Sequence, residues 1–192
     1  MTDMSLRDDN DDVRDRRSRI LDGARTAFLR FGFERSSMAD IAAGAGVSRT
    51  ALYHYFPGKE EVLRAVVDEL HAKSLSDAAE ALENSQTLGS ALIGLLETKF
   101  GRALAVIAAS PHGLELVDAT SRLTGEATRA ADDAFRALVV KALVRHGQPQ
   151  EAEAVADTLV AAAKGLMRSG EVHVPKAKFK QRVHRLVGWL ID

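Results

Sequence analysis

The sequence contains no cysteine, only two tyrosines and four prolines, and no long run of apolar residues. The absence of cysteine excludes disulfide bonds, thiolate nucleophiles and cysteine-ligated metal sites, and it is typical of a protein in a reducing cytoplasm. The apolar runs are too short to cross a bilayer, and residues 1–12 are polar and acidic, unlike a signal or transit peptide. We therefore expect a soluble, cytoplasmic protein without a membrane partner.

Patterns typical of enzymes are also missing. The six histidines are scattered, and the sequence has no His-Glu-x-x-His, no P-loop and no arrangement typical of a Ser/His/Asp triad. Gly44-x-Gly46 follows no predicted strand, so it is not a dinucleotide-binding fingerprint. The sequence therefore predicts no catalytic residue, no metal site and no cofactor, and it argues against an enzyme.

Helical periodicity extends through most of the chain. Apolar residues recur at spacings of three and four, and no convincing alternation of apolar and polar residues occurs. These patterns predict an all-α fold, and 192 residues are enough for two unequal units. We expect a disordered acidic segment over residues 1–12, a small helical unit over 13–59 and a larger helical bundle over 60–192.

Positive charge is concentrated in the predicted small unit, although the whole chain has a net charge of −1. A local excess of this sign suits the phosphates of a nucleic acid, but solvated helix faces often have one too. Residues 13–59 contain four acidic side chains and nine basic ones, namely Arg14, Arg16, Arg17, Arg19, Arg25, Arg30, Arg35, Arg49 and Lys59.

The segment from Ser37 to Phe56 has the pattern of a helix-turn-helix. Ser37 followed by Asp40 predicts a capping box, Gly46 permits a tight turn, and Ser48 is a cap for a second helix. In this motif the second helix presents polar side chains to the major groove of DNA. Phe56 and one face of Tyr53 could instead be core aromatics, but a core role does not explain why both tyrosines lie beside a histidine here. The predicted outer face comprises Arg49, Thr50, Tyr53, His54 and Tyr55.

Three stretches together strongly resemble the TetR family of repressors: Arg30 to Ala42, Ala45 to Ser48, and Leu52 to Leu63. The resemblance covers about the first third of the chain. It is specific because a helix end, a capped helix, a turn, an aromatic helix and a following lysine occur in a fixed order. It implies DNA contacts from Ser37, Ser48, Arg49, Thr50, Ala51, Tyr53, His54, Tyr55 and Lys59, the last to a phosphate. Tyr55 stands where the family very often has histidine, which makes its contact less defined.

The resemblance also implies a function for residues 60–192, as an effector-binding and dimerisation domain. The protein would then be a homodimeric repressor that binds a palindromic operator in double-stranded DNA and is released by a small-molecule effector. The apolar stripes of the last two helices could form the dimer interface, or they could pack against their own subunit. The candidate interface residues are Val155, Leu159, Ala162, Leu166, Phe179, Val183, Leu186 and Leu190.

An effector pocket would lie among the central helices of this domain. Beyond residue 60 the chain has few aromatics and no tyrosine, so aliphatic side chains would line the pocket and the effector would be lipophilic. The candidate lining residues are Phe100, Leu104, His112, Leu116 and Phe135, although His112 could also be a cap or a surface residue. The alternative function is a helical dimeric scaffold or partner-binding protein that does not bind an operator.

Overall fold

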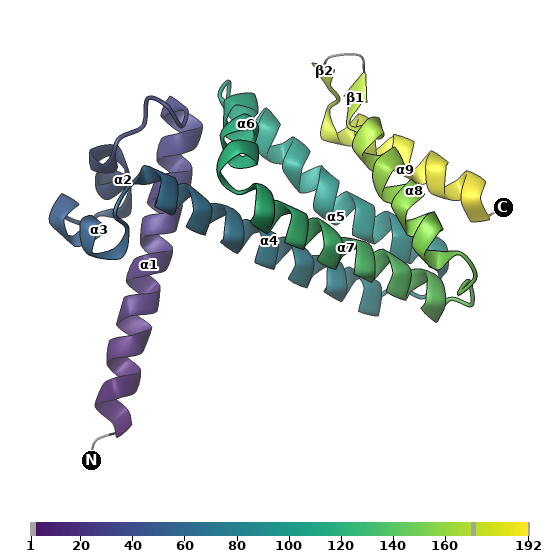
Figure 1. Cartoon of the computed structure of the whole chain (residues 1–192), viewed down its shortest axis with the longest axis horizontal. Coiled ribbons are helices and arrows are strands. Elements are labelled where there is room, and N and C mark those ends of the chain that lie inside the picture. Colours follow the sequence, from purple (N-terminus) through teal and green to yellow (C-terminus); the bar gives the residue numbers. More distant parts are fainter. Residues whose placement is uncertain (1–2, 170–171, 192) are drawn as a thin grey trace. The chain divides into compact units, whose positions relative to one another are not determined.

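A computed structural model describes residues 3–169 and 172–191, with side chains from residue 14 onward except that of Val172. The predicted all-α fold is confirmed, apart from a short antiparallel hairpin that the periodicity did not predict (Figure 1). No helix among the described residues is long and apolar enough to cross a membrane. The elements are α1 (Asp3–Phe31), α2 (Met38–Ala45), α3 (Arg49–Tyr55), α4 (Lys59–Glu83), α5 (Leu88–Ala108), α6 (Gly113–Leu123), α7 (Gly125–Arg145), α8 (Ala152–Leu166), β1 (Arg168–Ser169), β2 (Val172–His173) and α9 (Lys176–Ile191).

The chain forms two compact units. The first comprises residues 1–69 and 110–125, and the second comprises residues 70–109 and 126–192. Helix α4 therefore begins in the first unit and ends in the second, while α6 belongs to the first unit although it follows α5. The boundary predicted between residues 59 and 60 falls inside the first unit.

Helix α1 begins earlier than predicted. The sequence indicated a helix from about Val13 and disorder over residues 1–12, whereas α1 begins at Asp3. Residues 1 and 2 of the predicted acidic segment lie outside the described residues.

In the first unit, α1 and α2 pack with their backbones in contact. A Cβ atom added to Gly23 of α1 would lie 2.5 Å from the backbone nitrogen of Ala45 and 2.8 Å from the carbonyl carbon of Gly44. Only a residue without a side chain fits between the two helices at this point. The inward face of α1 comprises Ile20, Leu21, Ala24, Ala27 and Phe28, which are all buried.

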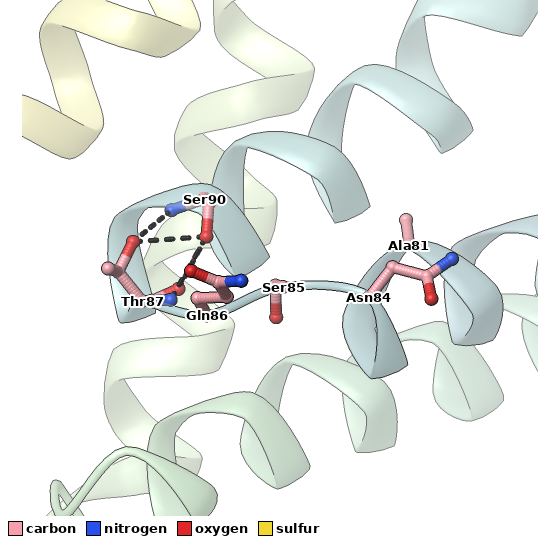
Figure 2. A pocket seen from close by; sticks show the side chains of 6 residues that line it. All are labelled: Ala81, Asn84, Ser85, Gln86, Thr87 and Ser90. Atoms are coloured by element: carbon pink, nitrogen blue, oxygen red, sulfur yellow. Dashed lines mark hydrogen bonds between the residues drawn. The ribbon is translucent and has the colours of Figure 1, made fainter.

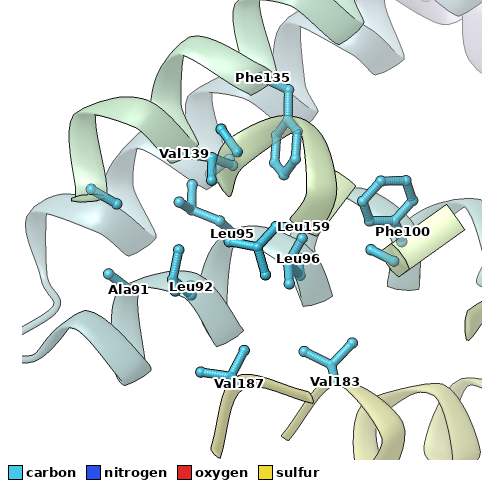
Figure 3. Close-up of a cluster of buried hydrophobic side chains, with 14 of the residues drawn as sticks. Ala91, Leu92, Leu95, Leu96, Phe100, Phe135, Val139, Leu159, Val183 and Val187 are labelled. Carbon is cyan, nitrogen blue, oxygen red and sulfur yellow. The ribbon is translucent and has the colours of Figure 1, made fainter. Parts of the chain in front are cut away.

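The core of the second unit lies between α5, α7, α8 and α9 (Figure 3). The ring of Phe100 meets that of Phe135 edge-on, with 5.9 Å between centroids, and lies 6.3 Å from that of Phe179. Figure 2 shows the turn between α4 and α5, where Thr87 and Ser90 form a capping box beside a small pocket. The residues lining this pocket are mostly polar, and none of the predicted effector residues is among them.

Replacing Gly23 by alanine should destabilise the first unit. The new methyl group would clash with backbone atoms that cannot rotate away, so we expect a loss of at least about 2 kcal/mol in the free energy of unfolding. Urea denaturation followed by circular dichroism measures this loss. The matched control is Gly101→Ala in α5, where the new Cβ would lie 3.4 Å from the flexible side chain of Lys176. An equally stable Gly23→Ala variant would contradict the close packing of α1 on α2.

Candidate nucleic-acid interface

Helix α2 begins with the predicted capping box. The Ser37 hydroxyl oxygen accepts a hydrogen bond from the backbone N–H of Asp40 at 3.2 Å. In return, the Asp40 carboxylate accepts from the Ser37 hydroxyl at 2.6 Å and from the Ser37 backbone N–H at 2.9 Å. These bonds from Ser37 hold the pKa of the Asp40 carboxyl below its usual range. Asp40 thus performs the role that Glu or Gln usually has in this motif.

The turn after α2 depends on a left-handed backbone at Gly46, whose φ is +64°. This conformation lets the N–H of Gly46 donate to the carbonyl of Ala43 at 3.2 Å and that of Val47 donate to the carbonyl of Ala42 at 3.0 Å. Ser48 then caps α3, because its hydroxyl accepts from the N–H of Ala51 at 3.0 Å. The predicted helix, turn and second helix are therefore all confirmed.

Helix α3 has one buried and one exposed face. Leu52 and Phe56 are buried, so the interpretation of Phe56 as a core aromatic is confirmed. Tyr53 is different, because 44% of its surface is exposed. The exposed residues of α3 are Arg49, Thr50, Tyr53 and His54, while Ala51 and Tyr55 are half-buried. The structure thus places most of the predicted DNA-contacting side chains on one accessible helix.

Arg49 and Tyr53 form a pair on this exposed face. The Arg49 Nη2 atom donates to the Tyr53 hydroxyl at 3.3 Å, and the guanidinium carbon lies 5.6 Å from the centroid of the tyrosine ring. The hydrogen bond raises the pKa of the Arg49 guanidinium, which therefore stays charged. A planar, charged guanidinium with free N–H groups can bind a guanine edge or a phosphate through two hydrogen bonds.

Lys59 points inward, contrary to the predicted phosphate contact. Its Nζ atom donates to the carbonyls of Phe33 and Glu34, each at 2.9 Å, and to that of Ser36 at 3.3 Å. The same nitrogen lies 4.7 Å from the centroid of the Phe33 ring. An ammonium group has three donors, and here all three are used within the chain. Lys59 therefore joins the start of α4 to the connection between α1 and α2.

Helix α6 also holds this connection, which sequence reasoning missed. The N–H of Glu34 donates to Glu115 Oε1 at 2.9 Å and, as the largest cause, lowers the pKa of the Glu115 carboxyl. Arg35 Nη2 lies 3.0 Å from His112 Nε2. His112 was a candidate effector ligand, but the structure places it beside the α1–α2 connection. The partners are about eighty residues apart in sequence, and no local pattern indicates such a contact.

The other predicted effector residues are divided between the two units. Phe100, Leu104 and Phe135 are buried in the core of the second unit (Figure 3), whereas Leu116 is buried in the first unit with the rest of α6. The structure therefore does not gather the five residues around one pocket within either unit.

The predicted dimer residues divide into buried and accessible ones. Leu159, Phe179 and Val183 are buried in the core of their own unit, which supports the alternative reading of these stripes. The stripes face inward because α5 covers them. Val155, Ala162, Leu166 and Leu186 are half-buried, and Leu190 is exposed. Sequence reasoning missed Trp189 of α9, which is 77% exposed.

Known proteins with similar sequences match mainly the first unit. The family model for bacterial regulatory proteins of the tetR family matches residues 20–66. The HTH-type transcriptional regulator TtgR of Pseudomonas putida is 35% identical over 86 residues, which are 44% of this chain and 41% of TtgR. The HTH-type transcriptional repressor KstR2 of Rhodococcus jostii is 36% identical over 85 residues, 42% of each chain. The chain thus spans about two fifths of the length of these relatives.

Solved structures match both units in fold. A TetR/AcrR family regulator from Thermobifida fusca has a TM-score of 0.66 at 22% identity, covering 90% of this chain and 96% of that one. FadR from Bacillus subtilis, in complex with stearoyl-CoA, has a TM-score of 0.62 at 16% identity, covering 88% and 96%. Fold and site define a helix-turn-helix protein with a helical second unit. The helix-turn-helix of this chain resembles that of bacterial regulatory proteins of the tetR family, whose model matches residues 20–66, about a quarter of the chain.

Replacing Lys59 by methionine should destabilise the first unit rather than remove a DNA contact. Three carbonyls would lose a charged donor, and we expect a loss of about 2–3 kcal/mol in the free energy of unfolding. The control is Lys73→Met, which breaks an exposed ion pair with Asp77 and should cost less than about 1 kcal/mol. Urea denaturation of both variants tests this, and equal stabilities would contradict the inward role of Lys59.

Proposed function

We propose that this chain is a transcription regulator that binds double-stranded DNA through the exposed face of α3. The observation that carries the proposal is the Arg49–Tyr53 pair, which holds a charged guanidinium on the surface of a short capped helix. Among the described residues, Arg49 has no acidic partner that would neutralise it. The match of residues 20–66 to the tetR family model adds support, and so do the similar sequences of TtgR and KstR2, which are named as HTH-type regulators.

The residues of α3 suit different parts of a DNA duplex. Arg49 suits a guanine edge in the major groove, and Thr50 offers a methyl group to thymine. Tyr53, His54 and Tyr55 suit phosphates, which fix the position of the helix without reading sequence. Ser37 is exposed at the start of α2, and its hydroxyl can donate to a further phosphate only by releasing the Asp40 carboxylate, to which it donates at 2.6 Å. Lys59 is omitted from this set because its donors are used within the chain.

We further propose that the protein acts as a homodimer on a palindromic operator. Large apolar side chains remain exposed near the end of α9, where Trp189 is 77%, Leu190 50% and Ile191 47% exposed. Neighbouring exposed apolar residues are typical of protein–protein interfaces, and tryptophan is a common anchor there. A two-fold symmetric dimer would present two α3 helices to two half-sites about one helical turn of DNA apart, or a multiple of it.

The regulator would act as a repressor that a lipophilic effector releases. Phe100, Leu104 and Phe135 are buried apolar side chains, which suits an aliphatic ligand that displaces them, and Lys99 Nζ lies 5.0 Å from the centroid of the Phe135 ring. The similar fold of FadR bound to stearoyl-CoA fits such a ligand. Release requires that the effector bind more tightly to the conformation with low operator affinity.

The test of DNA binding starts from the selection of duplexes that the protein binds among fragments of the source genome. Arg49→Ala and Tyr53→Ala should then each weaken binding to the recovered operator at least about tenfold, because a good base contact contributes about 1–3 kcal/mol. Fluorescence anisotropy measures the affinity, and denaturation should show unchanged stability. Arg129→Ala on the exposed surface of α7 is the control. Unchanged operator affinity in both α3 variants would contradict the site, and a wild type without salt-dependent duplex binding would support the scaffold alternative.

The dimer is tested through Trp189, the only tryptophan of the chain. Its fluorescence should shift to longer wavelength on dilution, because dissociation exposes the indole to water. Trp189→Arg should sediment as a monomer and bind the operator more weakly. Val144→Arg is the matched control, since Val144 is 51% exposed on α7. A Trp189→Arg variant that sediments like the wild type would exclude this residue from the interface.

A further inference from the structure

The proposed function leaves a cluster of arginines on α1 without a role. Every residue from 14 to 19 is exposed, and four of the six are arginines. Arg19 forms an ion pair with Asp15 one turn away, with 3.4 Å between Nε and Oδ2. From the sequence, this cluster could be a phosphate-binding surface or an ordinary solvated helix face. The structure distinguishes the arginines by where they lie around the helix.

Arg17 lies beside the recognition helix. Its guanidinium carbon is 5.8 Å from the ring centroid of Phe56, the residue that directly follows α3. The backbone N–H of Phe56 donates to the carbonyl of Leu52 and so forms the last hydrogen bond of α3. Phe56 directly follows Tyr55, so the Arg17 guanidinium is adjacent to the C-terminal end of α3. Figure 1 shows α1 continuing past α3 toward its own N-terminus. Arg17 therefore lies next to α3, at the end of that helix where Phe56 follows Tyr55.

Contact with an aromatic ring leaves the arginine able to bind an anion. The 5.8 Å between the guanidinium carbon and the ring centroid is within the range of a cation–π contact. The Phe56 ring carries no charge that would neutralise Arg17, and the guanidinium has five N–H donors with which it can bind an anion. Arg14 precedes Arg17 by three residues and lies on the same side of the helix. Arg19 follows by two residues, so it points about 200° away around the helix axis.

We propose that Arg14 and Arg17 bind phosphates of the DNA backbone next to the segment that α3 reads. This inference rests on the proposed DNA-binding function and extends its contact surface to α1. The partner is duplex DNA because Arg17 lies against the residue that directly follows Tyr55, next to the proposed DNA-binding helix, and because both arginines are opposite in charge to a row of phosphates. The contact adds affinity without sequence preference, since phosphates are the same in every sequence.

The test compares three arginine variants on the recovered operator and on a scrambled duplex of equal length, at several salt concentrations. Arg17→Ala should lower affinity for both duplexes by a similar factor, about three- to tenfold at low salt, and reduce the slope of log K against log salt by about 0.9. Arg14→Ala should act in the same way, and it leaves the Arg17 contact with Phe56 intact. Arg19→Ala, on the opposite side of α1, is the matched control and should change the slope little.

The outcomes separate this proposal from the function on which it rests. A wild type that binds the operator with steep salt dependence, together with unchanged slopes in Arg14→Ala and Arg17→Ala, would overturn the α1 contact alone. Equal effects of all three variants would show only a general charge effect and would also overturn it. Loss of operator preference in Arg17→Ala, with the scrambled duplex bound as before, would contradict a phosphate contact. A wild type that binds no duplex would refute the proposed function itself.

Discussion

The hydrogen bonds of Lys59 are the constraint on which the helix-turn-helix depends. Lys59 is the first residue of α4, and its ammonium group binds carbonyls of the segment that leads from α1 into α2. This one side chain therefore fixes the start of α4 relative to the end of α1 and the start of α2. That segment contains Ser36, which is buried and donates to the carbonyls of Ala27 and Gly32. Without a donor at position 59, the three carbonyls that Lys59 binds would have to accept hydrogen bonds from water, although those of Phe33 and Ser36 are partly buried. The position of α2, and therefore of α3, follows from this contact.

A second set of constraints comes from α6. Glu115 occupies the space that a side chain at Gly32 would fill, and the backbone at Gly32 is left-handed with a φ of +80°. Arg122 adds an exposed ion pair to Glu34 at 3.1 Å, and the Arg64 side chain donates to the carbonyl of Leu123. The connection between α1 and α2 is thus held from α4 on one side and from α6 on the other. A change at either helix would reach the connection that leads into α2, and through it the proposed DNA-binding surface of α3.

The sequence could predict the helix-turn-helix because its signals are local. Ser37, Gly46 and Ser48 act within three or four residues of themselves, and their caps and turn were confirmed. Contacts that join distant residues have no such signal, which is why Gly23 against α2 and Glu115 against Glu34 were not foreseen. The role of Lys59 was misread because a lysine after a recognition helix suits a phosphate and a carbonyl equally well. An amphipathic stripe such as that of α9 likewise shows that a face is covered, but not whether its own chain or a second copy covers it.

The return of residues 110–125 to the first unit determines how the chain could be recombined. Residues 110–125, which include α6 and the connections on either side of it, belong with α1 and α2, although they lie between α5 and α7 in the sequence. A hybrid protein that joins the first unit to a different helical bundle would therefore need α6 as well as the first 69 residues. Cutting the chain once would separate Glu34 from Glu115. The first unit is therefore built from two separate segments of the sequence, and both must be transferred together.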